Sequence, residues 1–463
     1  MAHQRVVVMI QENKSTDFYF PTLNLWGADV EDRGNLLKAA PNYDQPHDRN
    51  SWVHFKIGDY PAGAAQIDND AVIPYYSFLA KEFTFCDHHF GVGSNSTPGH
   101  MMLVCGQTPT LRNYFTTLRD WDLPTIFTHA EKSGLSWLAF PDQHRYPTSS
   151  FTELKQSKKI RTSADFLKLA KQGTLPDLCY VWSPAGYDEH PPRGSNPAYV
   201  TNGHYLTWQR VDAVIAGGHW DDTIFILTWD DWGGYADHVQ TPGSELVPDQ
   251  LHPNGFQAIG GSRIPLIMFG GQVDQGIESE WHSHATVVKT VIDVLGLPAL
   301  GVPRVDQAPS LASRVRPGLN RPKPPAYGAQ VQQPAPPPNP GVNQTHAWKG
   351  PINVMMPPLV ANGGRKIPAP TDGAVYPKPP KLPSGGHPFQ PAQHDYRYGK
   401  AAPAATARSA GGRKPTRAAT PAKTRTLSPA GHRTKARQTK GRSQVAAKSR
   451  SQPKPASGSR RLR

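Results

Sequence analysis

The segment that decides the fold is residues 223–239, TIFILTWDDWGGYADHV. Its first six residues form an apolar run, which is typical of a strand buried inside a parallel sheet. Two carboxylates, Asp230 and Asp231, follow directly. A pair of glycines, which tolerate positive φ, then turns the chain before Asp237 and His238. Adjacent carboxylates repel one another unless a cation neutralises them, so the pattern favours a metal site, with a solvated loop as the alternative.

Comparable apolar runs recur along the first 300 residues, and segments of helical length separate them. This alternation predicts an α/β/α sandwich with a largely parallel central sheet. The other expected strands are Arg5 to Ile10, Leu135 to Phe140, Leu178 to Trp182 and Ile264 to Phe269. The expected helices are Leu123 to Lys132, Ala164 to Lys171, Tyr205 to Ala216 and Ala285 to Leu295.

Polar residues also follow two other strands. Glu12 and Asn13 come after the first strand, and Asp188 and His190 come after the run that ends at Trp182. Ligands of open α/β sheets bind beyond the carboxyl ends of the strands, so we expect these groups to meet at one edge. Each motif taken alone has a simpler interpretation, a helix cap for the first and a surface turn for the second.

A fourth motif is GSNSTPGHMML, residues 93–103, in which Ser96 and Thr97 precede an apolar helix. The N-terminus of a helix presents backbone N–H groups and a positive dipole end, where a phosphate would be bound. An ordinary hydroxyl cap is the alternative. His47, in the loop DQPHDRN, is a weaker candidate, because a lone loop histidine is usually structural or solvated.

Taken together and in this order, the motifs in residues 3–300 resemble the bacterial phosphoesterase family of phospholipases C and acid phosphatases, within the alkaline phosphatase superfamily. The first motif reads Glu-Asn-Lys-Ser-Thr-Asp-Phe-Tyr-Phe from Glu12, where the family has Glu-Asn-x-Ser-Phe-Asp-x-Tyr-Phe. The second reads Asp-Asp-Trp-Gly-Gly-Tyr-Ala-Asp-His-Val from Asp230, where the family has Asp-Glu-x-Gly-Gly-x-x-Asp-His-Val. Asp231 stands where the family has Glu, Gly99 stands where the family has Asn, and Lys14 adds a cation to the first motif.

The resemblance implies a phosphoester hydrolase with one divalent metal ion and a phospho-serine intermediate. Its implied metal ligands are Glu12, Asn13, Asp230 and Asp231. The nucleophile maps onto Ser96, with Thr97 as the fallback. The implied phosphate-binding or proton-transferring histidines are His47, His190 and His238, and the carboxylates that orient them are Asp188 and Asp237. A phospholipid is one candidate substrate, and the leaving group stays open.

Charge divides the chain. Residues 401–463 hold 17 Lys or Arg and no acidic residue, so the net charge of +14 leaves about −3 for residues 1–400. We expect a catalytic domain over residues 1–313, a Pro-rich linker over 314–400 that packs in part on the core, and a disordered basic tail over 401–463. No apolar run is long enough for a transmembrane helix.

The polycationic tail gives a second hypothesis from another class. The chain would then bind nucleic acid or an anionic membrane surface through the tail, with weak or lost hydrolysis. The N-terminus shows no export signal, so we expect a cytoplasmic location, or a secreted or periplasmic one if the natural start lies upstream.

Overall fold

The computed structural model describes residues 4–42, 44–53, 55, 57–92, 94–108, 113, 121–141, 146–191, 199–239, 244–247, 256–259, 261–338, 360–361 and 365–366. The expected basic tail, residues 401–463, lies outside them, as does nearly all of the linker beyond residue 338.

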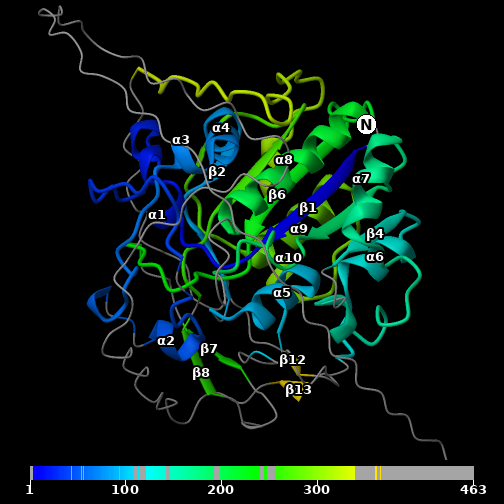
Figure 1. Ribbon diagram of the computed structural model, residues 1–463. Coiled ribbons are helices and arrows are strands. Elements are labelled where there is room, and N and C mark those ends of the chain that lie inside the picture. Colours follow the sequence, from blue (N-terminus) through cyan, green and yellow to red (C-terminus); the bar gives the residue numbers. More distant parts are fainter. Residues whose placement is uncertain are drawn as a thin grey trace, which may run out of the picture. The chain divides into compact units, whose positions relative to one another are not determined.

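The centre of the described part is a seven-stranded sheet with the order β10-β2-β9-β6-β1-β5-β4 (Figure 1). β1 lies inside the sheet between β6 and β5 with all seven residues buried, which explains the apolar run from Val6 to Ile10. The strands of this sheet are β1 (Arg5–Gln11), β2 (Thr84–Cys86), β4 (Trp137–Phe140), β5 (Leu178–Trp182), β6 (Thr223–Trp229), β9 (Leu266–Gly270) and β10 (Gly276–Glu278).

The sheet is mostly parallel, as the sequence predicts. β1 pairs in parallel with both β5 and β6, and β4 pairs in parallel with β5. β9 differs, because it runs antiparallel to both of its neighbours, β6 and β2. The apolar pattern of residues 264–269 shows that the strand is buried but carries no information about its direction, which only the chain path decides.

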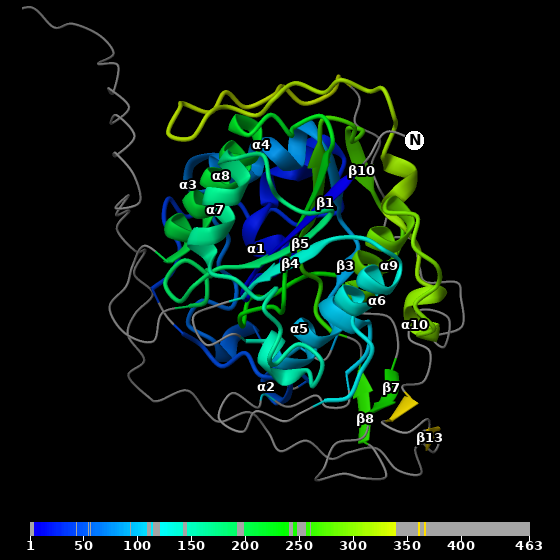
Figure 2. The same cartoon turned by 90° about the vertical axis from the view of Figure 1, so that its right-hand side faces the viewer.

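Helices lie on both faces of the sheet (Figure 2). α4, α7 and α8 cover one face, and α6 and α9 cover the other, so the fold is the expected α/β/α sandwich. The helices are α1 (Thr16–Tyr19), α2 (Arg49–Val53), α3 (Asn69–Val72), α4 (Pro74–Glu82), α5 (Ser96–Cys105), α6 (Ile126–Lys132), α7 (Ser163–Lys171), α8 (Tyr199–Ala216), α9 (His284–Val294) and α10 (Pro303–Asp306).

Among the described residues, three pairs of short strands lie outside the central sheet. They are β3 (His89–Phe90) with β11 (His282–Ser283), β7 (Ser244–Val247) with β8 (Phe256–Ile259), and β12 (Val360–Ala361) with β13 (Arg365–Lys366). In the described part of the chain, no helix combines the length and the apolar character needed to cross a membrane.

The chain after residue 313 continues along the core as far as residue 338. The indole nitrogen of Trp208 donates to the carbonyl of Pro325 at 2.8 Å, and that of Trp220 donates to the carbonyl of Arg321 at 3.0 Å. The ring of Tyr327 packs edge-on against Trp208. Buried indole N–H groups thus use the backbone of this proline-rich segment as their acceptors.

Candidate active site

The site begins where two neighbouring strands end together. β1 and β6 pair in a register that sets Gln11 opposite Trp229, so Glu12 and Asp230 are the next residues on adjacent strands. The amide of Asp230 donates to the carbonyl of Gln11 at 3.1 Å. A parallel pairing therefore unites two motifs that lie more than 200 positions apart in the sequence.

Asn13 connects the two motifs directly. Its backbone N–H donates to Asp230 Oδ1 at 3.0 Å, and its φ is +64°, a left-handed conformation that asparagine tolerates better than most residues. Gly233 also has a positive φ, and a Cβ built there would lie 2.2 Å from the Asn13 carbonyl oxygen. Positive φ and close backbone approach together account for this glycine of the second motif.

Ser96, from a third segment of the chain, lies beside the same carboxylates. It is the first residue of α5, and its hydroxyl donates to Asp231 Oδ2 at 3.2 Å. A Cβ built on Gly99 would lie 2.3 Å from the carbonyl oxygen of Asp230. The glycine at this position, where the family has asparagine, therefore lets α5 pack directly on the backbone that carries the carboxylates.

Glu12, His100 and Asp230 form a group whose potential ligand atoms all lie within 4.8 Å of one another. Trp182 Nε1, which can only donate, donates to His100 Nδ1 at 3.2 Å. The proton of the neutral imidazole therefore lies on Nε2, which is 3.4 Å from Glu12 Oε1 and 3.5 Å from Asp230 Oδ2. His100 thus presents an N–H to the two carboxylates and is poorly suited to bind a cation itself.

The side-chain amide of Asn13 lies between His190 and Asp231. One end is 3.1 Å from His190 Nε2, and the other end faces the Asp231 carboxylate. The Pro191 carbonyl, 2.7 Å from His190 Nδ1, takes the proton of that nitrogen, so Nε2 of the neutral ring is an acceptor. With Nε2 as an acceptor, the amide NH₂ faces His190 and the amide oxygen faces the carboxylate, which a cation between the oxygens would stabilise. Without a cation, the reversed amide donates its NH₂ to Asp231 and accepts from His190 Nε2.

The burial of the site carboxylates also favours a bound cation. Asp230 and Asp231 are 0% and 1% exposed. Within the described residues, Asp230 Oδ2 makes no hydrogen bond, since the 3.5 Å separation from His100 Nε2 is too long for one. Burial, together with the charges of Asp230 and Glu12, raises the pKa of Asp231 well above its ordinary value. Oxygen ligands of this kind suit a hard or borderline divalent cation, so Glu12, Asn13, Asp230 and Asp231 fit one.

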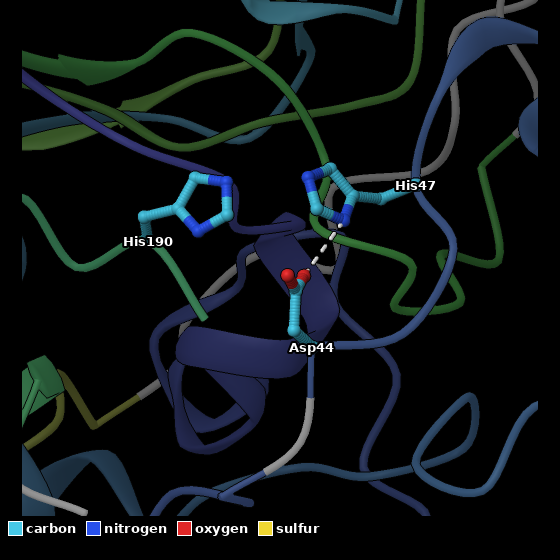
Figure 3. Close-up of side chains that lie close together, drawn as sticks. All are labelled: Asp44, His47 and His190. Carbon is cyan, nitrogen blue, oxygen red and sulfur yellow. Dashed lines mark ion pairs between the residues drawn. The ribbon is translucent and has the colours of Figure 1, made fainter. Parts of the chain in front are cut away.

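His47 and His190 lie beside this group and form a second cluster with Asp44 (Figure 3). The two imidazole rings are 5.2 Å apart, and His47 Nδ1 lies 3.4 Å from Asp44 Oδ1 and 2.7 Å from the Gln45 carbonyl. Burial, followed by the positive charge of His47, lowers the pKa of His190 to about 4. The structure thus brings both predicted histidines to the edge of the carboxylate group.

The loop after β5 presents the remaining residues of the third motif. Asp188 accepts a hydrogen bond from the backbone N–H of His190 at 3.2 Å, so it orders the loop and does not contact the imidazole through that bond. The Glu12 amide donates to the Asp188 carbonyl at 2.7 Å, which fixes the loop against the first motif. Burial raises the pKa of Asp188 to about 6.

Asp237 and His238 occupy a different network. His238 Nδ1 lies 2.8 Å from Asp17 Oδ2 and its Nε2 lies 3.0 Å from Asp29 Oδ1, so both ring nitrogens already face carboxylates. The buried guanidinium of Arg263 pairs with Asp17 at 2.7 Å and with Asp237 at 2.9 Å. The described contacts therefore do not bring these two predicted residues into the group around Asp230.

Thr97, the alternative nucleophile, has other partners. Its hydroxyl accepts a hydrogen bond from Tyr146 at 3.0 Å, and its backbone N–H donates to Asn113 Oδ1 at 2.9 Å. The hydroxyl of Ser96, by contrast, donates to Asp231, one of the predicted metal ligands.

The sequence analysis assigned no role in the site to three residues that the structure places there. Lys14 is buried and donates to the carbonyls of Glu12 and Glu189, and burial lowers its pKa to about 8. His100 follows Ser96 by one helical turn, a spacing that could have indicated it. Glu189 lies inside a motif that the sequence did identify, but nothing in the local pattern shows that its side chain turns inward.

Comparison with known proteins gives a class of protein for this arrangement. The sequence profile of the Phosphoesterase family matches residues 64–298, about half of the chain, and we conclude that the chain belongs to the Phosphoesterase family. This confirms the resemblance that the motifs indicate.

Among its relatives is non-specific phospholipase C4 from Arabidopsis thaliana, 26% identical over 232 residues, which are 47% of this chain and 41% of that protein. Another is the hemolytic phospholipase C of Pseudomonas aeruginosa, 22% identical over 386 residues, which are 62% of this chain and 52% of that protein. The chain thus spans only about half the length of these relatives. A solved protein of the alkaline phosphatase superfamily from Vibrio parahaemolyticus is 13% identical, with a TM-score of 0.38 over 65% of this chain and 68% of that one.

Proposed function

We propose that the chain hydrolyses phosphoesters through nucleophilic attack by Ser96 and depends on one divalent cation. The observation that carries the proposal is the hydrogen bond between the Ser96 hydroxyl and Asp231, in the group of oxygen atoms that Glu12, Asn13 and Asp230 complete. Membership of the Phosphoesterase family supports the reaction class. A divalent cation held there supplies positive charge that favours an ionised hydroxyl and offsets charge on phosphoryl oxygens.

Residues of the chain carry out the attack on phosphorus and the proton transfers. Ser96 Oγ attacks phosphorus, its bond to phosphorus forms as the bond to the leaving oxygen breaks, and the leaving group departs as an alcohol after it takes a proton. Water then breaks the Oγ–phosphorus bond, which releases the phosphate product and restores the hydroxyl. His47 and His190 lie beside this group, where an imidazole can exchange a proton with the substrate.

Phospholipids are the substrate class that we propose first, because two relatives are named as phospholipases C. The residues assigned here would contact only the phosphate of a substrate, so monoesters with other leaving groups fit the same chemistry. His238 is left out of the phosphate contacts in this proposal, because both of its ring nitrogens face carboxylates.

The test compares Ser96→Ala and Asp230→Asn with the wild-type protein on phosphatidylcholine and p-nitrophenyl phosphate. We expect kcat to fall by about a thousandfold or more in both variants, with unchanged far-UV and near-UV circular dichroism. Chelation with EDTA should abolish wild-type turnover, and Mn²⁺ or Mg²⁺ should restore it. Wild-type rates in either folded variant would refute the assignment of this site.

A further inference from the structure

Glu189 is a fully buried carboxylate held in an unusual backbone conformation. It is 0% exposed, and its φ of +69° is a left-handed value that a glutamate rarely adopts. Such a conformation costs free energy and persists only when the surroundings enforce it. The hydrogen bonds of its side chain show what enforces it here.

Four donors from different parts of the chain converge on this carboxylate. Oε2 accepts from Tyr19 Oη at 2.7 Å and from Trp229 Nε1 at 2.9 Å. Oε1 accepts from Tyr76 Oη at 2.7 Å and from Gln11 Nε2 at 3.2 Å. A buried carboxylate is stable only when hydrogen bonds satisfy its oxygens, and these four donors do so.

Two of these donors stand directly before proposed cation ligands. Gln11 is the last residue of β1 and precedes Glu12, while Trp229 is the last residue of β6 and precedes Asp230. The single side chain of Glu189 therefore cross-links the ends of both ligand-bearing strands. Among the described residues, the side-chain hydrogen bonds of Glu189 do not reach the ligand side chains themselves, so its action on them is indirect.

The neighbouring helix is shaped to accept this side chain. A Cβ built on Gly203 of α8 would lie 2.3 Å from Glu189 Cγ and 2.7 Å from the Tyr187 carbonyl oxygen. Gly203 lies inside a helix of 18 residues, where glycine costs about 1 kcal/mol relative to alanine. The space that the missing side chain leaves is occupied by Glu189.

We propose that Glu189 is a positioning residue that sets the separation of the β1 and β6 ends, and thereby the affinity of the Glu12 and Asp230 group for its cation. This inference rests on the proposed function, because it concerns the cation site assigned there. Outer residues that orient metal ligands typically change metal affinity by about 10- to 100-fold when they are replaced.

Two substitutions remove or displace the cross-link by different routes. Glu189→Met keeps the approximate volume but leaves the Trp229 indole N–H without an acceptor. Gly203→Ala keeps the Glu189 carboxylate, but the added Cβ displaces that side chain. Alanine has a higher helix propensity than glycine, so the substitution does not weaken α8 itself. We expect each variant to raise the dissociation constant for Mn²⁺ by about tenfold or more, measured as free Mn²⁺ by electron paramagnetic resonance.

Glu189→Gln is the conservative variant, and a local rearrangement can accommodate it. Its oxygen can still accept from Trp229 and Tyr19. Its NH₂ can donate to the side-chain oxygen of Gln11, which has no hydrogen-bond partner among the described residues, once that amide turns over. We expect Mn²⁺ affinity within about threefold of wild type, a rescue that a requirement for charge alone would not give.

Val214→Ala, a cavity variant in the buried face of α8, controls for destabilisation by itself. It should lower the midpoint of urea unfolding and leave Mn²⁺ affinity unchanged. Equal Mn²⁺ affinities in wild type, Glu189→Met and Gly203→Ala would overturn the positioning role of Glu189 and leave the proposed cation site standing. If Glu189→Met does not fold, Gly203→Ala decides. A wild-type protein that binds no Mn²⁺ would overturn the proposed cation site and the positioning role with it.

Discussion

Ser96 and Asp231 are 135 positions apart in the chain, and the hydroxyl of the first donates a 3.2 Å hydrogen bond to a carboxylate oxygen of the second. This contact distinguishes Ser96 from its neighbour Thr97, whose hydroxyl accepts a hydrogen bond from Tyr146. Both hydroxyls lie in the first turn of α5, so local sequence could not separate them.

The first prediction concerns these two hydroxyls. Thr97→Val removes the acceptor of Tyr146 but leaves the Ser96 hydroxyl in place, so we expect kcat for p-nitrophenyl phosphate to stay within about fivefold of wild type. Ser96→Ala should remove turnover, because it removes the attacking oxygen. Incubation of each variant with a slowly hydrolysed phosphoester and mass spectrometry of the peptide that contains both residues would locate a phosphorylated side chain. Phosphate on Thr97 would reverse the assignment.

Gly99 gives a second prediction. Gly99→Ala places a Cβ 2.3 Å from the Asp230 carbonyl oxygen and so forces α5 away from the carboxylates. We expect a loss of about 1–3 kcal/mol in the free energy of unfolding and a lower kcat. Gly58→Ala is the matched control, because a Cβ there meets nothing within 4 Å. Urea denaturation and initial rates measure both variants, and equal stabilities would contradict the close packing.

Arg263 gives a third prediction. Its guanidinium is buried between Asp17 and Asp237, and Arg263→Met leaves both carboxylates without that cation. Removal of one partner from a buried ion pair costs about 3–5 kcal/mol. Arg316→Met removes an exposed ion pair with Asp274 and should cost less than about 1 kcal/mol. Chemical denaturation of the two variants side by side tests this difference.

The pH dependence of stability gives a fourth prediction. Burial opposes the protonated form of His238, but hydrogen bonds to Asp17 and Asp29 outweigh it and raise its pKa to about 10, from about 6.5 when unfolded. A raised pKa adds stability that is complete below pH 6.5 and disappears as the pH rises toward 10. Because His238 is partly exposed, we expect the wild type to exceed His238→Asn by only about 1–2 kcal/mol at pH 6. The difference should vanish above pH 10, and a gap independent of pH would show that the charge does not matter.

The sequence by itself predicted the main strands and helices of the fold and the members of the proposed cation site. The apolar run that opens the segment 223–239 requires a buried strand, and carboxylates that follow such a strand must lie at the edge of its sheet. Glu12, Asn13, Asp230 and Asp231 could therefore be identified from local pattern and resemblance, and the structure brings them together.

Only the tertiary structure decided how these groups are joined and supported. The register of β1 against β6, the antiparallel direction of β9 and the network of His238 with Arg263 all depend on contacts between distant segments. Local sequence pattern does not predict these contacts. Hydrophobic burial is non-directional, so it does not fix strand direction or register, and the partner of a charged side chain can lie at any distance along the sequence. Glu189 is a further example. Its position in a turn motif suggests a surface residue, whereas the tertiary structure buries it completely.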